Sequence, residues 1–212
     1  MQIDRFDFGG RRIRRFLGVV TVIAAVILSL LPATSSAQEA SAADATTWYV
    51  DGSTGADGNC NTASAPCRNI QAAIDRAAGG DVILVAEGTY TFSGGNSCTA
   101  QTGTPSVVCV FTKKLTLRGG YPSGNFSTAN PAQNPTIIDG QSQNRGVFVL
   151  SFNSPGATAL DMAGFTVRNG LGVGIGKRPG EDAYFGFGGG MFVEFAGSIV
   201  LRDMVFENNR AV

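Results

Sequence analysis

The sequence predicts an all-β fold of the solenoid type, a parallel β-helix whose N-terminal end is covered by one short amphipathic helix. Short apolar runs alternate with glycine and asparagine turns along most of the 212 residues, a pattern typical of solenoids, sandwiches and barrels. Two successive segments in the C-terminal half repeat one another, which favours the solenoid. One helical pattern occurs, and it directly precedes a fully apolar run.

The N-terminal segment is predicted to be a secretory signal peptide. A basic cluster, Arg11–Arg15, precedes the apolar run Leu17–Leu31, and small residues follow, so we expect cleavage after Ala37. The apolar run has about 15 residues, whereas a membrane-spanning helix needs about 20, and an uncleaved membrane anchor is the alternative. Residues 38–47 then form a linker, and 48–212 form the β-helix domain of a protein that is secreted or held at the cell surface.

Composition excludes several classes of function. The chain contains no histidine, which rules out a Ser-His-Asp triad, a Cys-His pair and a histidine-ligated zinc site within it. Removal of residues 1–37 takes five arginines and two aspartates from the 16 basic and 16 acidic residues, which leaves a net charge near −3. Nucleic-acid binding would need a basic patch, so no nucleic-acid partner is expected.

Four cysteines lie in two local pairs, Cys60 with Cys67 and Cys98 with Cys109. In an exported chain, such spacing predicts two short-range disulfides, each closing a loop. Three pairings are formally possible, and proximity in the sequence favours these two. A four-cysteine metal site would show Cys-x-x-Cys spacing, which is absent, so no metal is expected.

The helical pattern covers Ile70–Ala78, where apolar residues recur at i, i+3, i+4 and i+7. Gly79-Gly80 is expected to end this helix, and Val82–Val85 to form a strand of the first coil. The first coil of a solenoid would otherwise expose an apolar end and an unpaired strand edge. We therefore predict that the helix is a cap, with an ordinary αβ unit of another fold as the alternative.

The predicted strands are short and are separated by turns. The segment Gly52–Ala65, rich in small polar residues, is expected to be a loop. The strands are expected at Trp48–Asp51, Val82–Val85, Val107–Phe111, Leu115–Leu117, Thr136–Ile138, Val147–Leu150, Phe165–Val167, Met191–Phe195, Ile199–Leu201 and Met204–Phe206.

The internal repeat has two parts. GVFVLS (146–151) matches GMFVEF (190–195) at an offset of 44, and MAGFTVRNG (162–170) matches LRDMVFENN (201–209) at an offset of 39. A long segment, residues 171–187, is interpreted as an insertion between the two copies. Without it, one unit has roughly 22–27 residues, a length that suits one coil of a parallel β-helix.

Several segments resemble known proteins. SAPCRNIQAAIDRAAGGDVILVAEGTY (64–90) resembles the cap helix and first coil of right-handed parallel β-helix proteins of the pectate-lyase-like (pectin lyase-like) superfamily, and LTLRGGY (115–121) and PTIIDG (135–140) resemble its coils. GGGMFVEFAGSIVLRDMVFENNRA (188–211) is similar to repeats of bacterial surface β-helix proteins of the polymorphic outer-membrane type. There, 206–209 (FENN) fits the FxxN motif of these repeats. GGMF (189–192) fits their GGA-plus-aliphatic motif only partly, because Met191 replaces the small residue. The resemblance implies a right-handed helix, export and an adhesin-like role.

The enzymes of that superfamily act on acidic polysaccharides, and the lyases among them use carboxylates that hold Ca²⁺ and an arginine or lysine base. In the repeat alignment no carboxylate stacks on another, and the arginine-proline signature of the lyases and the Gly-His-Gly of the hydrolases are absent. We therefore assign no catalytic residue and expect no cofactor, with Ca²⁺ required only if the chain is a lyase. The candidates weighed are Asp139, Asp161, Glu194, Asp203 and Glu207, with Arg118, Arg145, Arg168 and Arg202.

Other residues have structural interpretations. Asn169 and Asn208 are predicted to be steps of an asparagine ladder that bonds backbone from coil to coil, and Arg168 is predicted to pair with Glu207 on the surface. Tyr184, Phe185 and Phe187, in the insertion, are the predicted binding residues, because exposed aromatic rings stack on sugars or anchor a partner. The alternative is that these rings pack back on the solenoid.

The favoured function is an exported, non-catalytic module that binds a polysaccharide or a surface protein, with the membrane involved only through the N-terminal segment. The alternatives are a polysaccharide lyase with an incomplete site and a structural stalk. No C-terminal capping segment is visible in the sequence, so the chain is expected to be the N-terminal part of a longer protein.

Overall fold

The computed structural model describes residues 44–94, 98, 104–151, 154–173 and 187–212. The predicted signal peptide, most of the linker, and Tyr184 and Phe185 lie outside these residues. No helix in the described part of the chain is long and apolar enough to cross a membrane.

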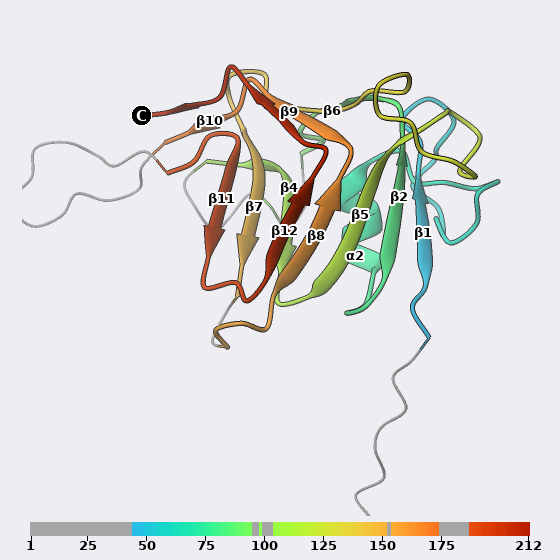
Figure 1. Cartoon of the computed structure of the whole chain (residues 1–212), viewed down its shortest axis with the longest axis horizontal. Helices are drawn as coiled ribbons and strands as arrows, with labels where there is room; N and C mark the ends of the chain where they lie inside the picture. Colours follow the sequence, from blue (N-terminus) through green and yellow to red (C-terminus); the bar gives the residue numbers. More distant parts are fainter. Residues whose placement is uncertain (1–43, 95–97, 99–103, 152–153, 174–186) are drawn as a thin grey trace, which may run out of the picture. The chain divides into compact units, whose positions relative to one another are not determined.

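The described residues form a solenoid in which every paired strand is parallel to its neighbour (Figure 1). The described chain passes repeatedly through three sheets, here called A, B and C, and two further short strands form a separate two-stranded sheet. This arrangement confirms the predicted all-β parallel solenoid. Sheet A contains β1 (Thr47–Val50), β2 (Val82–Ala86), β5 (Lys114–Tyr121), β8 (Ala159–Ala163) and β12 (Ile199–Arg202). Sheet B contains β3 (Gly88–Tyr90), β6 (Thr136–Asp139), β9 (Phe165–Arg168) and β13 (Val205–Glu207), and sheet C contains β4 (Ser106–Phe111), β7 (Arg145–Leu150) and β11 (Met191–Glu194).

The pairing register confirms the repeat read from the sequence. Met191 pairs with Val147, and Leu201 pairs with Met162, as the two offsets predict. One boundary was wrong: β10 (Leu171–Gly172) pairs with β14 (Arg210–Ala211), so the first two residues of the predicted insertion belong to the coil. Gly172 is buried, and a Cβ there would clash with the carbonyl of Phe187, so the close approach of the chain at this point requires a glycine.

Alternate residues of each strand point into the solenoid and stack in rows from coil to coil. In sheet A one such row contains Ile83, Leu117 and Met162, each fully buried, and its next member is Leu201. These rows and the apolar face of the helix form one continuous hydrophobic core. Burial of such apolar surface stabilises the fold by about 25 cal/mol per Å².

The helix α2 (Ile70–Arg76) closes the N-terminal end of the solenoid. Ile70 and Ile74 are buried in the core, and the side-chain amide of Gln71 takes the place of a neighbouring strand. Its Oε1 accepts a hydrogen bond from the N–H of Cys109 at 2.8 Å, and its Nε2 donates to the carbonyl of Cys109 at 3.2 Å. Gln71 thus satisfies backbone groups at the free edge of β4, which would otherwise be buried without partners.

A second N-terminal edge strand is β1, and a disulfide loop covers it. The N–H of Tyr49 donates to the carbonyl of Cys60, and the N–H of Cys67 donates to the carbonyl of Tyr49, each at 2.8 Å. Cys60 is bonded to Cys67, and Cys98 to Cys109, which are the predicted pairs.

The helix ends earlier than the sequence suggests. Its last residue is Arg76, not a residue next to the glycine pair, and Ala77 already has extended backbone angles. The carboxylate of Asp81 explains the early end, because it accepts hydrogen bonds from the N–H of Ala78 and the indole of Trp48, each at 2.8 Å. Gly80 turns the chain into β2 at a φ of 103°, a conformation open to glycine.

Candidate functional site

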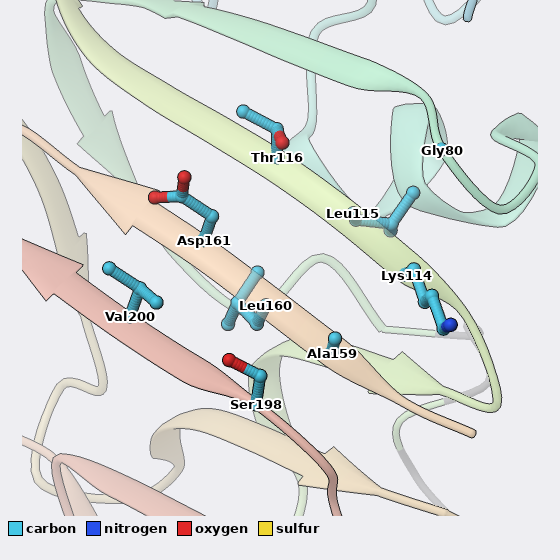
Figure 2. A pocket seen from close by; sticks show the side chains of 9 residues that line it. All are labelled: Gly80, Lys114, Leu115, Thr116, Ala159, Leu160, Asp161, Ser198 and Val200. Carbon is cyan, nitrogen blue, oxygen red and sulfur yellow. The ribbon is translucent and has the colours of Figure 1, made fainter. Parts of the chain in front are cut away.

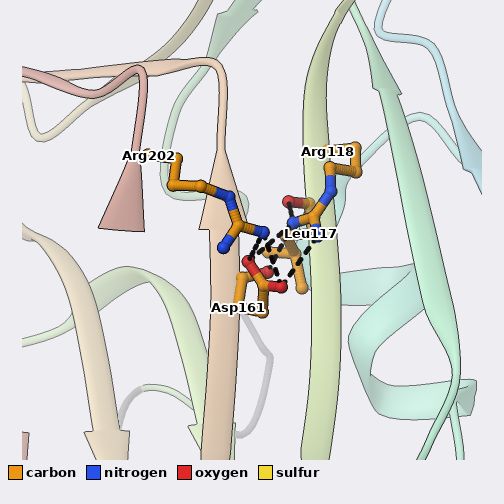
Figure 3. Close-up of polar contacts among 4 residues, drawn as sticks. All are labelled: Leu117, Arg118, Asp161 and Arg202. Atoms are coloured by element: carbon orange, nitrogen blue, oxygen red, sulfur yellow. Dashed lines mark hydrogen bonds and ion pairs between the residues drawn. The ribbon is translucent and has the colours of Figure 1, made fainter. Parts of the chain in front are cut away.

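The outer face of sheet A carries an ion-pair cluster formed by three of the charged residues weighed in the sequence. Asp161 on β8 lies between Arg118 on β5 and Arg202 on β12 (Figure 3). Nη2 of Arg118 donates to Oδ2 of Asp161 at 2.8 Å, and Nη2 of Arg202 donates to both carboxylate oxygens at 2.7 Å. Nη1 of Arg118 also donates to Oδ1 and to the backbone carbonyls of Leu117 and Asp161, each at 3.0 Å.

Register explains how the three side chains meet. Arg118, Ala163 and Arg202 occupy one outward row, and Asp161 occupies the same face two residues earlier. Side chains two residues apart on a strand share a face. Because Ala163 is small, both guanidinium groups reach over it to Asp161.

The cluster keeps its carboxylate ionised. Hydrogen bonds from Arg118 first, and then from Arg202, hold the pKa of Asp161 below its usual value, although partial desolvation works in the other direction. Two guanidinium groups around one carboxylate leave a net charge of +1. Such a carboxylate is a poor general acid, and the two cations oppose binding of a metal ion to it.

A hollow of about 200 Å³ lies next to the cluster on the same face (Figure 2). It crosses three strands, and Thr116, Asp161 and Val200 occupy one row along it. Lys114, whose side chain is exposed, adds another positive charge at the hollow. The remaining lining residues are Gly80, Leu115, Ala159, Leu160 and Ser198.

Aromatic rings lie toward the N-terminal end of the same face. Tyr49 occupies the outward row that leads through Leu84 to Arg118. Phe126, from the loop after β5, packs against Tyr49 with ring centroids 5.1 Å apart and against Tyr121 at 5.9 Å. All three rings are half-buried. The aromatic group adjoins the ion-pair cluster, because Tyr121 follows Arg118 on β5 and Tyr49 shares the outward row of Arg118. Burial raises the pKa of the Tyr121 phenol, and the nearby positive charge of Arg118 opposes this rise.

The sequence did not single out Lys114, Thr116, Ser198 or the three rings. The sequence could have predicted that Lys114 and Thr116 share the outer face of the sheet, because the alternation in KLTLR (114–118) places its polar residues on one face of the strand. The rings come together through a loop, and strand periodicity does not predict such a contact.

A second ion pair on sheet B corrects the predicted surface pair. Arg168 and Glu207 are neighbours in register, as expected, but Nε of Arg168 donates to Asp139 of the preceding coil at 2.8 Å. Burial works to raise the pKa of Asp139, but hydrogen bonds from the N–H of Gln141, from Arg168 and from Asn169 outweigh it and lower the pKa.

The asparagine ladder is shifted by one residue from its prediction. Asn169 and Asn208 share the same turn position at φ values of 49° and 52°, and Asn169 donates to the Asp139 carboxylate at 3.1 Å. Asn209 makes the coil-to-coil backbone bonds, accepting from the N–H of Gly170 at 2.8 Å and donating to the carbonyl of Val167 at 2.9 Å. Gly170 permits this because a Cβ there would meet the Asn209 side chain.

Arg145 and Phe187 lie away from sheet A. The Arg145 side chain is buried under the rings of Phe148 and Phe192, and it donates to the carbonyls of Phe187 and Gly188. Desolvation lowers the pKa of this guanidinium. Phe187, the one predicted aromatic binding residue within the described part, is 40% exposed and stacks on Phe192 with centroids 5.0 Å apart. Its role in binding stays a prediction.

The remaining acidic candidates do not join a site. Glu194, Asp203 and Glu207 lie on or next to the strands of the last described coil. Among the described residues, no three His, Cys, Asp or Glu side chains are placed to hold a metal ion together.

Comparison with known families gives one match. The family model described as "Protein of unknown function (DUF1565)" matches residues 53–211, which covers most of the solenoid. The chain belongs to the DUF1565 family. Curated proteins gave no match to this member of the family, and neither did solved structures.

Proposed function

We propose that this DUF1565 protein is an exported, non-catalytic module that binds a glycan along the outer face of sheet A. One observation carries the proposal: half-buried aromatic rings and a partly exposed arginine–aspartate cluster occupy a single face, beside a hollow that crosses three strands. The two disulfides support export, because such bonds persist in oxidising compartments outside the cytosol.

The chemistry of the face suits a carbohydrate. A sugar ring has an apolar C–H face that packs on an aromatic ring, and its hydroxyl groups accept from guanidinium and donate to carboxylate. Arg202 has half of its side chain exposed and offers donors to such a ligand. The hollow is smaller than the roughly 300–1,000 Å³ of enclosed small-molecule pockets, so an extended chain lying across the strands fits better than an enclosed molecule.

The same geometry argues against turnover. Glycoside hydrolases use two carboxyl groups about 5–9.5 Å apart. On the described part of this face, the cluster and hollow contain one carboxylate, Asp161, and both of its oxygens accept bonds from guanidinium groups. Its lowered pKa keeps it ionised, so it does not supply a proton near neutral pH.

The test is binding to an array of neutral and acidic glycans, followed by titration calorimetry on the best ligand. Tyr121→Ala and Arg202→Ala should each weaken binding about tenfold or more, which matches the loss of one good contact. Arg168→Ala, a matched removal of an ion-paired arginine on sheet B, should leave affinity unchanged. Equal affinity in all three variants, or release of reducing ends from the ligand by the unmodified protein, would contradict the proposal.

A further inference from the structure

A fully buried carboxylate lies close to the aromatic group formed by Tyr49, Tyr121 and Phe126. Asp51 comes directly after β1, two residues beyond Tyr49, and 0% of its surface is exposed. Burial of a charge is costly unless hydrogen bonds replace the lost water. The hydrogen bonds of Asp51 therefore show which parts of the chain this carboxylate joins.

One oxygen of the carboxylate belongs to the N-terminal loop. Oδ1 of Asp51 accepts hydrogen bonds from the N–H and the hydroxyl of Ser53, at 2.9 and 2.7 Å, and from the N–H of Thr54 at 3.2 Å. The backbone of Asp51 is held as well, because its N–H donates to the carbonyl of Cys67 at 2.8 Å. Cys67 is bonded to Cys60, so the disulfide loop fixes the position of the carboxylate.

The other oxygen binds a second loop, residues 122–130, which follows β5. Oδ2 of Asp51 accepts from the hydroxyl of Ser123 at 2.8 Å and from the N–H of Gly124 at 2.9 Å. The hydroxyls of Ser53 and Ser123 also bond to each other at 2.7 Å. The N–H of Ser123 donates to Glu87 over a longer distance, 3.3 Å. Asp51 thus joins the start of the second loop to the end of β1.

The second loop carries one of the three rings of the aromatic group. Phe126 follows shortly after the two residues that bond to Asp51, and its ring packs on Tyr49 from β1 and on Tyr121 from β5. A side chain at a binding surface keeps its geometry when hydrogen bonds hold its surroundings. The bonds to Asp51 supply such a hold for the backbone just before Phe126.

We propose that Asp51 is a positioning residue for the aromatic group: it holds the loop that carries Phe126, so that the three rings are arranged before a ligand arrives. Such preorganisation lowers the entropic cost of binding. Asp51 itself is fully buried, so it acts through the ring and not by touching the ligand. Its role in glycan binding rests on the proposed function, whereas its hold on Phe126 does not.

The pattern of donors requires an aspartate at this position. Oδ1 faces the N–H groups of Ser53 and Thr54, and Oδ2 faces the N–H of Gly124, and a backbone N–H can only donate. An asparagine has one accepting oxygen and one donating NH₂ group, which would face an N–H in either orientation. Burial works to raise the pKa of Asp51, but hydrogen bonds from Ser53, Ser123 and Gly124 outweigh it and lower the pKa, so the group stays ionised near neutral pH.

The first test is the nuclear Overhauser effect between the ring protons of Phe126 and Tyr49 in the protein without ligand. Asp51→Asn should lose most of this effect, and Ser123→Ala, which removes one loop bond and leaves the carboxylate, should weaken it less. Asp57→Asn is the matched control and should keep it. Asp57 also accepts two backbone N–H bonds, at 2.7 and 3.0 Å, but from the two residues before α2 and not from the loop that carries Phe126.

The second test is titration calorimetry with the best glycan from the array. Asp51→Asn and Phe126→Ala should each weaken binding about tenfold. The double variant should bind no more weakly than Phe126→Ala alone, because Asp51 acts through that ring, whereas the losses of Asp51→Asn and Arg202→Ala should add.

Two results would overturn the positioning role: an unchanged ring contact in Asp51→Asn, or additive losses for Asp51→Asn and Phe126→Ala. A merely structural carboxylate would give the second result. Absence of glycan binding by the unmodified protein would instead defeat the proposed function, and the ring contact would then decide the role of Asp51 by itself.

Discussion

The two ends of the described solenoid differ in how well their inward residues are covered. At the N-terminal end, a helix side chain and a disulfide loop replace the missing neighbours of β4 and β1, and inward residues of these first strands such as Val50 and Val110 are fully buried. At the C-terminal end the same inward positions, such as Leu201, are more than one third exposed. The comparison shows that an inward position in a solenoid does not guarantee burial. What covers the coil decides how much an apolar residue stabilises it.

The largest predicted effect compares two members of one inward row. Leu117→Ala should lower the free energy of unfolding by about 2–5 kcal/mol, because it leaves a cavity in a fully buried part of the core. Leu201→Ala should lower it by less than about 1 kcal/mol, because the Leu201 side chain is already partly hydrated.

Urea unfolding at low protein concentration measures both variants. Similar losses of stability at the two positions would mean that the Leu201 side chain is covered in solution.

A smaller effect is expected from removal of the cap's polar contact. Gln71→Ala should cost about 1–3 kcal/mol, since it leaves the buried N–H and C=O of Cys109 without their partner. Gln133→Ala, at an exposed position, is the matched control and should cost less than about 0.5 kcal/mol.

Hydrogen exchange locates the change produced by Gln71→Ala. The amide of Cys109 should lose protection, and amides of the last coil should keep theirs. Loss of protection in both places would show that the cap acts on the whole solenoid and not on its own end.

The smallest predicted effect concerns the charged cluster on sheet A. The pKa of Asp161 is lower in the folded chain than the value of about 3.9 in unfolded chains, so its contribution to stability is present above that value. The contribution is lost as the pH falls through the folded-state pKa. Because the carboxylate is partly exposed, the effect should be at most about 1 kcal/mol.

Unfolding by urea at pH 7 and at acidic pH tests this effect. Asp161→Asn should lose less stability on acidification than the unmodified protein, and Thr116→Val, a neighbour in register without a charge, should not alter the pH dependence. Identical pH profiles for Asp161→Asn and the unmodified protein would contradict the ionised, ion-paired state of Asp161.

Much of the fold was predictable because solenoid strands repeat. Alternation of apolar residues identified most strands, and the internal match aligned Leu201 with Met162, which the pairing register confirms. β3 and β8 were not identified as strands, because Gly88 disfavours a strand and the sequence of β8, ALDMA, contains two alanines and an aspartate.

The charged contacts were less predictable for a definable reason. The repeat aligned the last two coils only, so it gave Arg168 one neighbour, Glu207, and missed Asp139 on the other side. Arg118 joins Asp161 from a coil that the repeat did not include. A long side chain can form an ion pair with the coil before it or the coil after it, and the register of both coils decides which partner is within reach.

Hydrogen exchange tests the contrast between the two ends most directly. Amides in β4 and β5 should exchange slowly, because the helix side chain and the disulfide loop cover the first strands. Amides in β11, β12 and β13 should exchange more quickly, because the inward residues Val193, Leu201 and Phe206 are more than one third exposed. Equal protection of the strands at the two ends would contradict this account.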